Sequence, residues 1–193
     1  LNKIDFPLAA PSANISSRLS SVKPSDVKEE CGSKIKYILN GGKSKIGVES
    51  TILNLLEKPS LLRYGGLDTK NIENVLKKKL LININSKKKL SPGLFALHYS
   101  PGIPLRVNVK KPKKDEAYLL IKKRKSKLKN YYYLSKVKNI KEAAKNLYST
   151  LRKIKNDGFK KIAVETIPNK GLGKTINDRL KRASKYKWKI LLK

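Results

Sequence analysis

The stretch Pro7-Leu8-Ala9-Ala10-Pro11-Ser12-Ala13-Asn14 is the most informative segment of the chain. Its two prolines fix φ and remove two backbone donors, and the residue before a proline is pushed toward an extended conformation. Three small residues, two of them polar, follow the second proline. The pattern predicts an extended segment that ends in a loop able to bring backbone and hydroxyl groups close to a ligand.

Two further loops have a similar character. Gly47-Val48-Glu49-Ser50-Thr51 places a glycine before a strand start with two adjacent hydroxyls, and Ser91-Pro92-Gly93 precedes His98-Tyr99 in a tethered loop. We therefore predict three loops around one small-molecule site, with a second domain attached behind them.

The net charge of +32 invites a nucleic-acid interpretation. The chain has 39 lysines, 17 isoleucines and 15 asparagines but only seven arginines. Lys, Ile and Asn have AT-rich codons, so base composition is an alternative source of the charge, whereas nucleic-acid sites favour arginine for bidentate contacts. Charge alone leaves both explanations open.

The first part of the chain has the pattern of the end of an α+β domain. Asp68 is a suitable cap for a helix from Thr69 to about Lys78, with Ile72, Val75 and Leu76 on one face. The other expected elements are a helix over 25–30 between Pro24 and Gly32, a strand over 36–39, and a strand over 48–56 with a hairpin partner over 60–64.

Prolines, glycines and lysine clusters accumulate between 77 and 112, which predicts a linker with apolar groups that dock on something. After it, strand and helix patterns alternate, which predicts an α/β layer with a mostly parallel sheet. The expected strands cover 105–109, 117–121, 131–134, 162–164 and 188–192, and the expected helices run from a capping-box variant at Asn139 and Glu142 to Gly158, and from Thr175 to Lys185.

In this order and spacing, several motifs resemble the threonylcarbamoyl-AMP synthase family, the two-domain members of the YrdC-like group. They are PLAAPSAN (7–14), LNGG (39–42), GVEST (47–51), LLRYGG (61–66), SPG (91–93) with HY (98–99), and GLG…DRL (171–180). The resemblance implies three parts: the C-terminal part of a YrdC-like α+β twisted-sheet catalytic domain over 1–78, a lid-like linker over 79–104, and a small Rossmann-like α/β domain over 105–193.

The activity implied by the resemblance is an adenylation. L-Threonine takes up bicarbonate, and the carbamate attacks the α-phosphate of ATP, with Mg2+ accompanying the nucleotide. The products are threonylcarbamoyl-adenylate and pyrophosphate, and a downstream threonylcarbamoyl transferase complex uses the adenylate to modify tRNA. Such a nucleotidyltransferase needs positioning and charge neutralisation more than a nucleophile, and we identify no catalytic side chain and no metal-ligand spacing.

The matching motifs assign roles to individual residues. By resemblance, ATP would contact Ser12, Ser20, Arg63 and Tyr99, the threonine would contact Ser50, and Ala10, Asn14 and Thr51 would shape the pocket. The structural alternatives are turn capping for Ser12 and Asn14, strand hydroxyls for Ser50 and Thr51, a hairpin surface charge for Arg63, and linker packing for Tyr99.

The family pattern is not kept everywhere. After PSAN the family usually has Ser-Gly-Arg-Pro-Ser-Pro-Thr, whereas this chain has Ser16-Ser17-Arg18-Leu19-Ser20-Ser21-Val22, which puts the shape of this loop in question. The segment 171–175 ends like a Walker A loop, but Pro168 occupies the position of its first glycine, which argues against a phosphate-binding nest.

Two other functions compete with the synthase. The basic charge allows a module that binds double-stranded RNA or tRNA without catalysis, although no aromatic–basic RNA-recognition pattern is present. A carbamoyl-adenylate domain of hydrogenase maturation would resemble the first half but would lack the linker and the second domain.

Cys31 is the only cysteine, so no internal disulfide is possible, and no apolar run reaches the ~18 residues of a membrane span. We expect a cytoplasmic protein without a membrane partner. The chain contains no methionine, and the Lys and Arg that hold the triphosphate in the family are not in it. We therefore expect an N-terminal portion to be absent and this fragment alone to be inactive.

Overall fold

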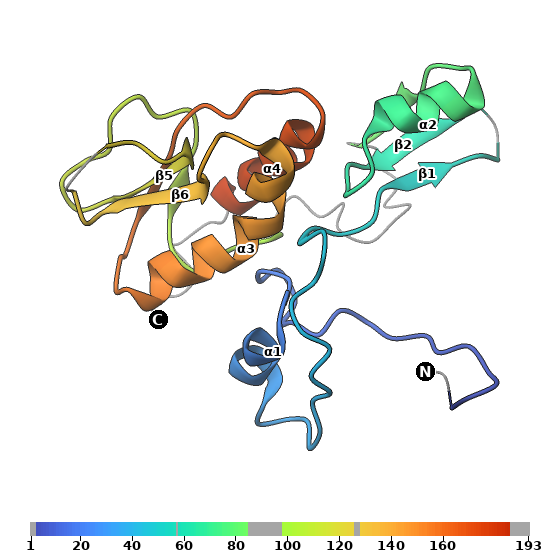
Figure 1. The fold of residues 1–193 in the computed structure, drawn as a ribbon, viewed down its shortest axis with the longest axis horizontal. Helices are drawn as coiled ribbons and strands as arrows, with labels where there is room; N and C mark the ends of the chain where they lie inside the picture. The colour runs from blue at the N-terminus through green and yellow to red at the C-terminus, as the bar shows by residue number, and fades with distance from the viewer. Residues whose placement is uncertain (1–2, 57, 85–97, 126–127, 186–193) are drawn as a thin grey trace.

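The computed structural model describes residues 3–56, 58–84, 98–125 and 128–185. These residues form a mixed α/β fold with a three-stranded and a four-stranded sheet, in agreement with the predicted class. Figure 1 shows α2 together with β1 and β2 in one unit, and α3 and α4 together with β5 and β6 in another. We refer to residues 3–84 as the first region and to residues 98–185 as the second region.

The sheet of the first region has the order β1-β2-β3. β1 (Ile52–Asn54) and β2 (Ser60–Arg63) form the predicted antiparallel hairpin, and β3 (Leu81–Ile82) adds to β2 in parallel. α2 (Thr69–Leu76) connects them, and the Asp68 carboxylate accepts a hydrogen bond from the Lys70 amide at 3.1 Å, which confirms the predicted cap.

α1 (Pro24–Cys31) confirms the predicted first helix. Proline suits its first turn because the amide that proline lacks has no intrahelical acceptor there. Gly32 follows the last residue, and the buried carboxylate of Asp26 accepts a hydrogen bond from the Val22 amide at 2.9 Å.

The sheet of the second region has the order β4-β7-β5-β6, and every pair is parallel. This confirms the predicted parallel sheet. The strands are β4 (Leu105–Arg106), β5 (Ala117–Lys122), β6 (Tyr131–Ser135) and β7 (Ile162–Val164), and β5 is buried except at its last residue. Burial on both faces is typical of a central parallel strand.

Two helices pack on one face of this sheet. α3 (Ile140–Asn156) buries the predicted stripe of Ala143, Ala144, Leu147, Leu151 and Ile154, and α4 (Leu172–Ser184) lies beside it. Leu119, Ile121 and Val164 face these helices, whereas alternate residues of the strands form a smaller cluster on the other face.

The main hydrophobic core includes residues from both regions. Leu19 and Val22 of the first region belong to the same cluster as Leu147 of α3 and Leu180 of α4. Tyr99 also belongs to it and is only 1% exposed. The first region is therefore docked on the helical face of the second, through apolar contacts as well as the polar contacts described below.

Some predicted elements differ from the structure. Residues 36–39 form no strand, because the described residues offer this exposed segment no partner strand; Leu39 is 94% exposed. The strand expected over 48–56 is reduced to β1, and α4 begins before Thr175. The strand expected over 188–192 lies outside the described residues.

The cap of α3 also differs in detail from a capping box. Asn139 accepts hydrogen bonds from the amides of Lys141 and Glu142, as expected, but the Asn139 amide donates to the hydroxyl of Ser135 at 2.8 Å. Ser135 in turn donates to the Glu142 carboxylate. The serine therefore takes the place that a direct Glu142 contact would have.

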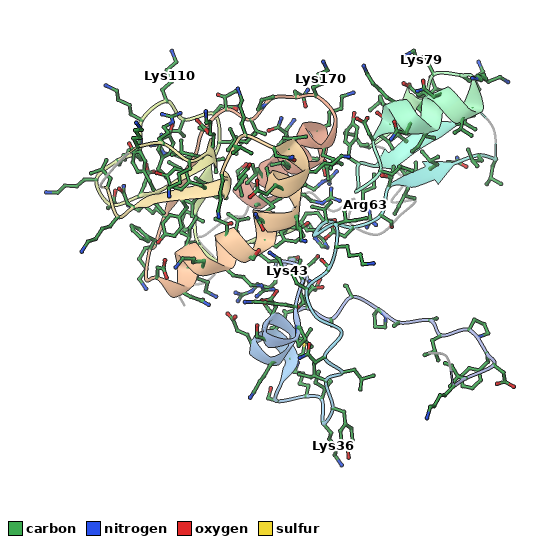
Figure 2. All side chains as sticks on the ribbon, in the orientation of Figure 1. Lys36, Lys43, Arg63, Lys79, Lys110 and Lys170 are labelled. Carbon is green, nitrogen blue, oxygen red and sulfur yellow. The ribbon has the colours of Figure 1, made fainter. Side chains whose placement is uncertain are left out.

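The basic side chains are widely distributed. In Figure 2 the labelled Lys36, Lys79, Lys110 and Lys170 extend outward from different parts of the molecule rather than from one face. Within the described residues, no helix has both the length and the apolar character that a membrane crossing requires.

Candidate functional site

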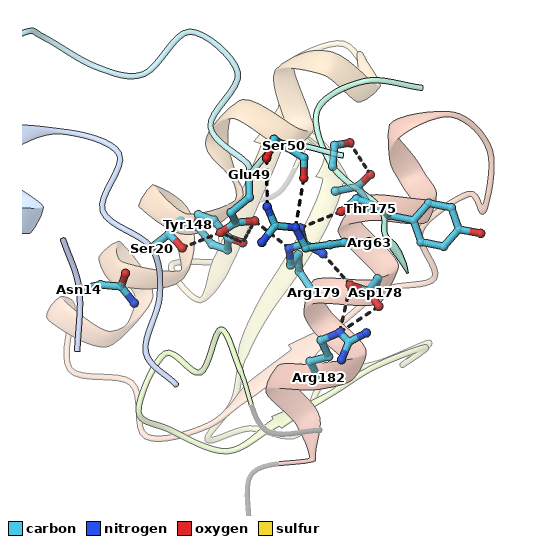
Figure 3. Close-up of polar contacts among 12 residues, drawn as sticks. Asn14, Ser20, Glu49, Ser50, Arg63, Tyr148, Thr175, Asp178, Arg179 and Arg182 are labelled. Carbon is cyan, nitrogen blue, oxygen red and sulfur yellow. Dashed lines mark hydrogen bonds and ion pairs between the residues drawn. The ribbon is translucent and has the colours of Figure 1, made fainter. Parts of the chain in front are cut away.

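Ser50 and Arg63 form a polar pair at the end of the β1–β2 hairpin. The antiparallel register places Arg63 opposite Ile52, two residues after Ser50. Arg63 Nε donates to the Ser50 carbonyl and Arg63 Nη2 donates to Ser50 Oγ, both at 3.1 Å (Figure 3). The hairpin thus joins a predicted threonine contact and a predicted phosphate contact, and a guanidinium fork is well suited to anions.

Gly65 allows the two segments of this pair to approach closely. A Cβ atom at Gly65 would overlap the backbone of Ser50 and Thr51. The Gly66 amide donates to the Glu49 carbonyl at 2.8 Å, and Thr51 Oγ1 exchanges hydrogen bonds with the backbone of Leu67. The glycines of the LLRYGG motif therefore have a packing role against the GVEST motif.

Glu49 connects this pair to the second region (Figure 3). Its carboxylate accepts hydrogen bonds from Ser20 Oγ at 2.5 Å, from the Tyr148 hydroxyl at 2.9 Å and from Arg179 Nε at 2.9 Å. Ser20 belongs to the first region, whereas Tyr148 lies on α3 and Arg179 on α4. One side chain of the GVEST motif thus holds together three segments that are far apart in sequence.

Arg179 is the cationic centre of this interface, and its side chain is 1% exposed. Besides Glu49 it donates to Asp178 Oδ2 at 2.6 Å and to the Tyr64 carbonyl at 2.8 Å. Its guanidinium lies over the ring of Tyr99, 4.5 Å from the centroid. Asp178 also pairs with Arg182 at 3.0 Å, so the buried charges are balanced.

These contacts fix the protonation of the interface. Burial acts to raise the pKa of Glu49, but the charge of Arg179 and the hydrogen bonds from Ser20 and Arg179 lower it overall, so the carboxylate is ionised at neutral pH. Burial and the adjacent Glu49 charge raise the pKa of Tyr148, which keeps its hydroxyl a donor.

Tyr99 lies in the interior beside these charges. Its ring stacks on Tyr148 with 5.9 Å between centroids, and its backbone is left-handed, with φ +61°. The ring of His98 is 4.1 Å from that of Tyr99, and burial, together with nearby arginines, lowers the pKa of His98 although Glu49 opposes the shift. Residues 85–97, which make up half of the expected lid over 79–104, lie outside the described residues.

The structure places the predicted site residues in two groups. The structure brings Ser20, Ser50, Thr51, Arg63 and Tyr99 into the neighbourhood of Glu49 and Arg179. Ala10 and Ser12 are exposed on the N-terminal segment, which runs out from the body in Figure 1, and the described residues show no hydrogen bond from Ser12 to that neighbourhood.

Asn14 has a local role in its loop. Its side-chain amide donates to the carbonyls of Ile15 and, at 3.4 Å, Arg18, while its Oδ1 is buried without a partner among the described residues. The predicted pocket role of Asn14 is neither supported nor contradicted by these contacts.

Ser50 and Thr51 also border a cavity of 740 Å3 beneath α2. The rest of its lining is mainly apolar and includes Val48, Leu53, Leu67, Ile72 and Leu76. No group of three or more His, Cys, Asp or Glu side chains suitable for a metal ion occurs in the part of the chain that the structure describes.

Sequence reasoning missed Glu49, Tyr148 and Arg179. Glu49 and Arg179 both belong to motifs of the sequence, GVEST and DRL, but the resemblance assigned roles only to the hydroxyl residues of the first motif. The scarcity of arginine was an available signal: in a chain with 39 lysines, an arginine inside a motif indicates a bidentate or buried contact. Tyr148 had no comparable signal.

Comparison with known proteins places this geometry in a family. A family model described as threonylcarbamoyl-AMP synthase, C-terminal domain, matches residues 67–185, and one described as telomere recombination matches residues 1–65. The chain belongs to the threonylcarbamoyl-AMP synthase family, as its motifs indicated.

Several curated relatives carry the name threonylcarbamoyl-AMP synthase. The protein from Pyrococcus abyssi (strain GE5 / Orsay) is 34% identical over 203 residues, which cover 94% of this chain and 58% of the relative. That from Bacillus subtilis (strain 168) is 29% identical over 198 residues, covering 93% and 57%. The chain thus spans little more than half the length of these relatives.

The chain is also similar to solved structures of related proteins. The crystal structure of P. abyssi Sua5 complexed with L-threonine matches with a TM-score of 0.76 and 31% identity, covering 91% of this chain and 57% of that one. A P. abyssi Sua5 variant with a His and the following Tyr changed to Ala matches with a TM-score of 0.74 and 30% identity, covering 91% and 56%.

Proposed function

We propose that this chain forms part of an L-threonylcarbamoyladenylate synthase, which makes threonylcarbamoyl-AMP and pyrophosphate from L-threonine, bicarbonate and ATP. The observation that carries the proposal is the Ser50–Arg63 pair, in which a hydroxyl and a guanidinium from two family motifs are joined at 3.1 Å. A related protein of the same fold has been crystallised with L-threonine.

The reaction forms a bond between a carbamate oxygen and the α-phosphorus of ATP and breaks the bond from that phosphorus to the β-phosphate bridge. Pyrophosphate leaves with the electron pair. Charge builds on the phosphate oxygens, so donors held in place matter more than a nucleophilic side chain. Arg63 is suited to that charge, and Ser50 to the polar groups of threonine.

The remaining assignments follow the same proposal. Ser12, Ser20 and Tyr99 would complete the ATP contacts, Ala10, Asn14 and Thr51 would shape the pocket, and Mg2+ would arrive with ATP. The adenylate would pass in the cytoplasm to a threonylcarbamoyl transferase complex that modifies tRNA. The distributed lysines favour no dedicated RNA face, so we do not advance the RNA-binding alternative.

Binding of L-threonine to the chain, measured by titration calorimetry, tests the proposal. Ser50→Ala should weaken binding about tenfold or more, because a hydrogen bond to a charged group contributes about 1.5–3 kcal/mol. Ser149→Ala is the matched control, since Ser149 lies on α3 and donates only to the Asn146 carbonyl within its own helix.

The second measurement is turnover by the protein in its natural length, followed as pyrophosphate release and as the adenylate mass. The proposal predicts product that requires threonine, bicarbonate and ATP together. A protein that neither binds threonine nor releases pyrophosphate under these conditions would refute it.

A further inference from the structure

We infer that Arg179, from helix α4 of the second region, is a positioning residue for the Ser50–Arg63 pair. Ser50 and Arg63 each have a neighbour in sequence that Arg179 holds. Arg179 Nε donates to the side chain of Glu49, and Arg179 Nη2 donates to the carbonyl of Tyr64. The inference deepens the proposed function and rests on it for the identity of the ligand.

A second contact from the same helix acts on the same segment. Thr175 Oγ1 donates to the Gly65 carbonyl at 2.8 Å and is buried. Thr175 and Arg179 are one helical turn apart, so both lie on one face of α4. Gly65 packs directly on the backbone of Ser50 and Thr51. Helix α4 therefore holds the segment that contains Arg63 against the segment that contains Ser50.

The chemistry of the contact explains why an arginine is used. The guanidinium presents several donors in a rigid plane, which lets one side chain bind a carboxylate and a carbonyl on two different segments. A lysine would bring the same charge but a single ammonium without that fork. Tyr99 stacks under the guanidinium at 4.5 Å and limits its movement.

In this arrangement the second region positions the binding residues of the first region. It contributes neither Ser50 nor Arg63, yet it determines how the loops that bear them are held. Small misplacements of binding groups cost about ten- to a hundredfold in catalysis. We therefore expect α4 to control the affinity of the first region for threonine without touching it.

The test uses Arg179→Lys in the full chain, with Arg182→Lys as the matched control. Arg182 is on the same helix and is 8% exposed, and it donates to Asp178 and the Ile84 carbonyl rather than to Glu49 or Tyr64. Thr175→Val, which keeps shape but loses the bond to Gly65, is a milder second variant in case Arg179→Lys does not fold.

Two readouts separate positioning from general stability. Hydrogen exchange at the Gly66 amide, which donates to the Glu49 carbonyl, should accelerate at least tenfold in Arg179→Lys relative to Arg182→Lys. Threonine affinity should fall about tenfold in Arg179→Lys and severalfold in Thr175→Val, and by less than twofold in the control. Equal effects of Arg179→Lys and Arg182→Lys on both readouts would overturn the inference.

The outcomes also separate this inference from the proposed function. If the wild-type chain binds no threonine and the protein in its natural length releases no pyrophosphate, the proposed function fails, and the exchange of Gly66 still decides whether Arg179 positions the loops. If threonine binds and neither Arg179→Lys nor Thr175→Val changes its affinity or the Gly66 exchange, the positioning role is refuted and the function stands.

Discussion

The two regions of the molecule differ in how they use their apolar side chains. In the second region, α3 buries Leu147 and Ile154 at 0% exposure, and the parallel sheet is covered on both faces. In the first region, Val75 of α2 is 83% exposed and Leu56 is 94% exposed. α2 and α3 each have an apolar stripe, so the hydrophobic periodicity was enough to predict both helices. Whether the stripe is buried depends instead on the tertiary contacts of each helix.

The largest expected effect comes from truncating a core residue of the second region. Leu147→Ala should lower the free energy of unfolding by about 3 kcal/mol, because it removes buried methyl groups and leaves a cavity. Val75→Ala should change it by less than about 0.5 kcal/mol. Urea denaturation of both variants measures the difference. A large cost of Val75→Ala would contradict the comparison, because it would mean that the apolar face of α2 that borders the cavity is covered in solution.

Replacing Glu49, whose carboxylate joins the two regions, should have a smaller effect on the free energy of unfolding. Glu49→Gln should cost about 2 kcal/mol at neutral pH, because hydrogen bonds to charged groups contribute about 1.5–3 kcal/mol. The folded pKa of Glu49 lies below its reference value of 4.5. Its stabilisation is therefore present above 4.5 and is lost as the pH falls through the folded value.

Urea midpoints at pH 7, 5, 4 and 3 provide the measurement. The wild type and Glu49→Gln should differ at neutral pH and converge on acidification. Glu29→Gln is the control, because Glu29 is exposed on α1. A difference between wild type and Glu49→Gln that is the same at pH 7 and pH 3 would contradict the assigned role of the charge.

Removing the N-cap side chain of one helix in each region should show how differently the two regions contribute to global stability. Asn139→Ala should cost about 1 kcal/mol of global stability, since Asn139 caps α3 through two amides. Asp68→Ala removes the equivalent contact from α2, and we expect it to accelerate hydrogen exchange within α2 while leaving the global unfolding midpoint nearly unchanged. If both variants shift the global midpoint equally, the first region unfolds together with the second.

The sequence allowed much of the fold to be predicted, because local signals determine local structure. The Asp68 cap, the buried stripe from Ala143 to Ile154 and the alternation of strand and helix all appear as expected. The strand expected over 36–39 was wrong, because β-propensity forms no strand without a neighbouring strand to pair with.

The candidate site was predicted less completely. The resemblance of the motifs to the family indicated Ser50 and Arg63, and the structure joins the two side chains by a hydrogen bond. The Glu49–Arg179 contact spans 130 positions of sequence, and periodicity and motif spacing carry no information about such a pairing. The choice of arginine in a lysine-rich chain was the signal that could have indicated a contact of Arg179 with an oxygen acceptor. In the described residues, hydrogen bonds to oxygen acceptors come from Arg63, Arg106, Arg124, Arg152, Arg179 and Arg182.

The smallest expected effect concerns an ion pair on the surface of the second region. Lys161 Nζ lies 2.7 Å from Asp115 Oδ2, and the two side chains are 52% and 58% exposed. Arg152 Nη1 lies 2.8 Å from Glu30 Oε1 between the two regions, with exposures of 7% and 11%. The distances are nearly equal, but water screens the first pair and largely not the second.

A double-mutant cycle on Lys161→Ala and Asp115→Ala should therefore give a coupling too small to resolve from the shift in urea midpoint. The same cycle on Arg152→Ala and Glu30→Ala should give a clear coupling, because each single substitution leaves the other charge buried without its partner. Raising the salt from about 0.05 M to about 0.5 M should remove any residual coupling of the exposed pair and leave most of the buried one. Equal couplings for the two pairs would show that the docking of the first region on the second is as solvated as the outer surface, which the buried contacts around Arg179 and Arg152 argue against.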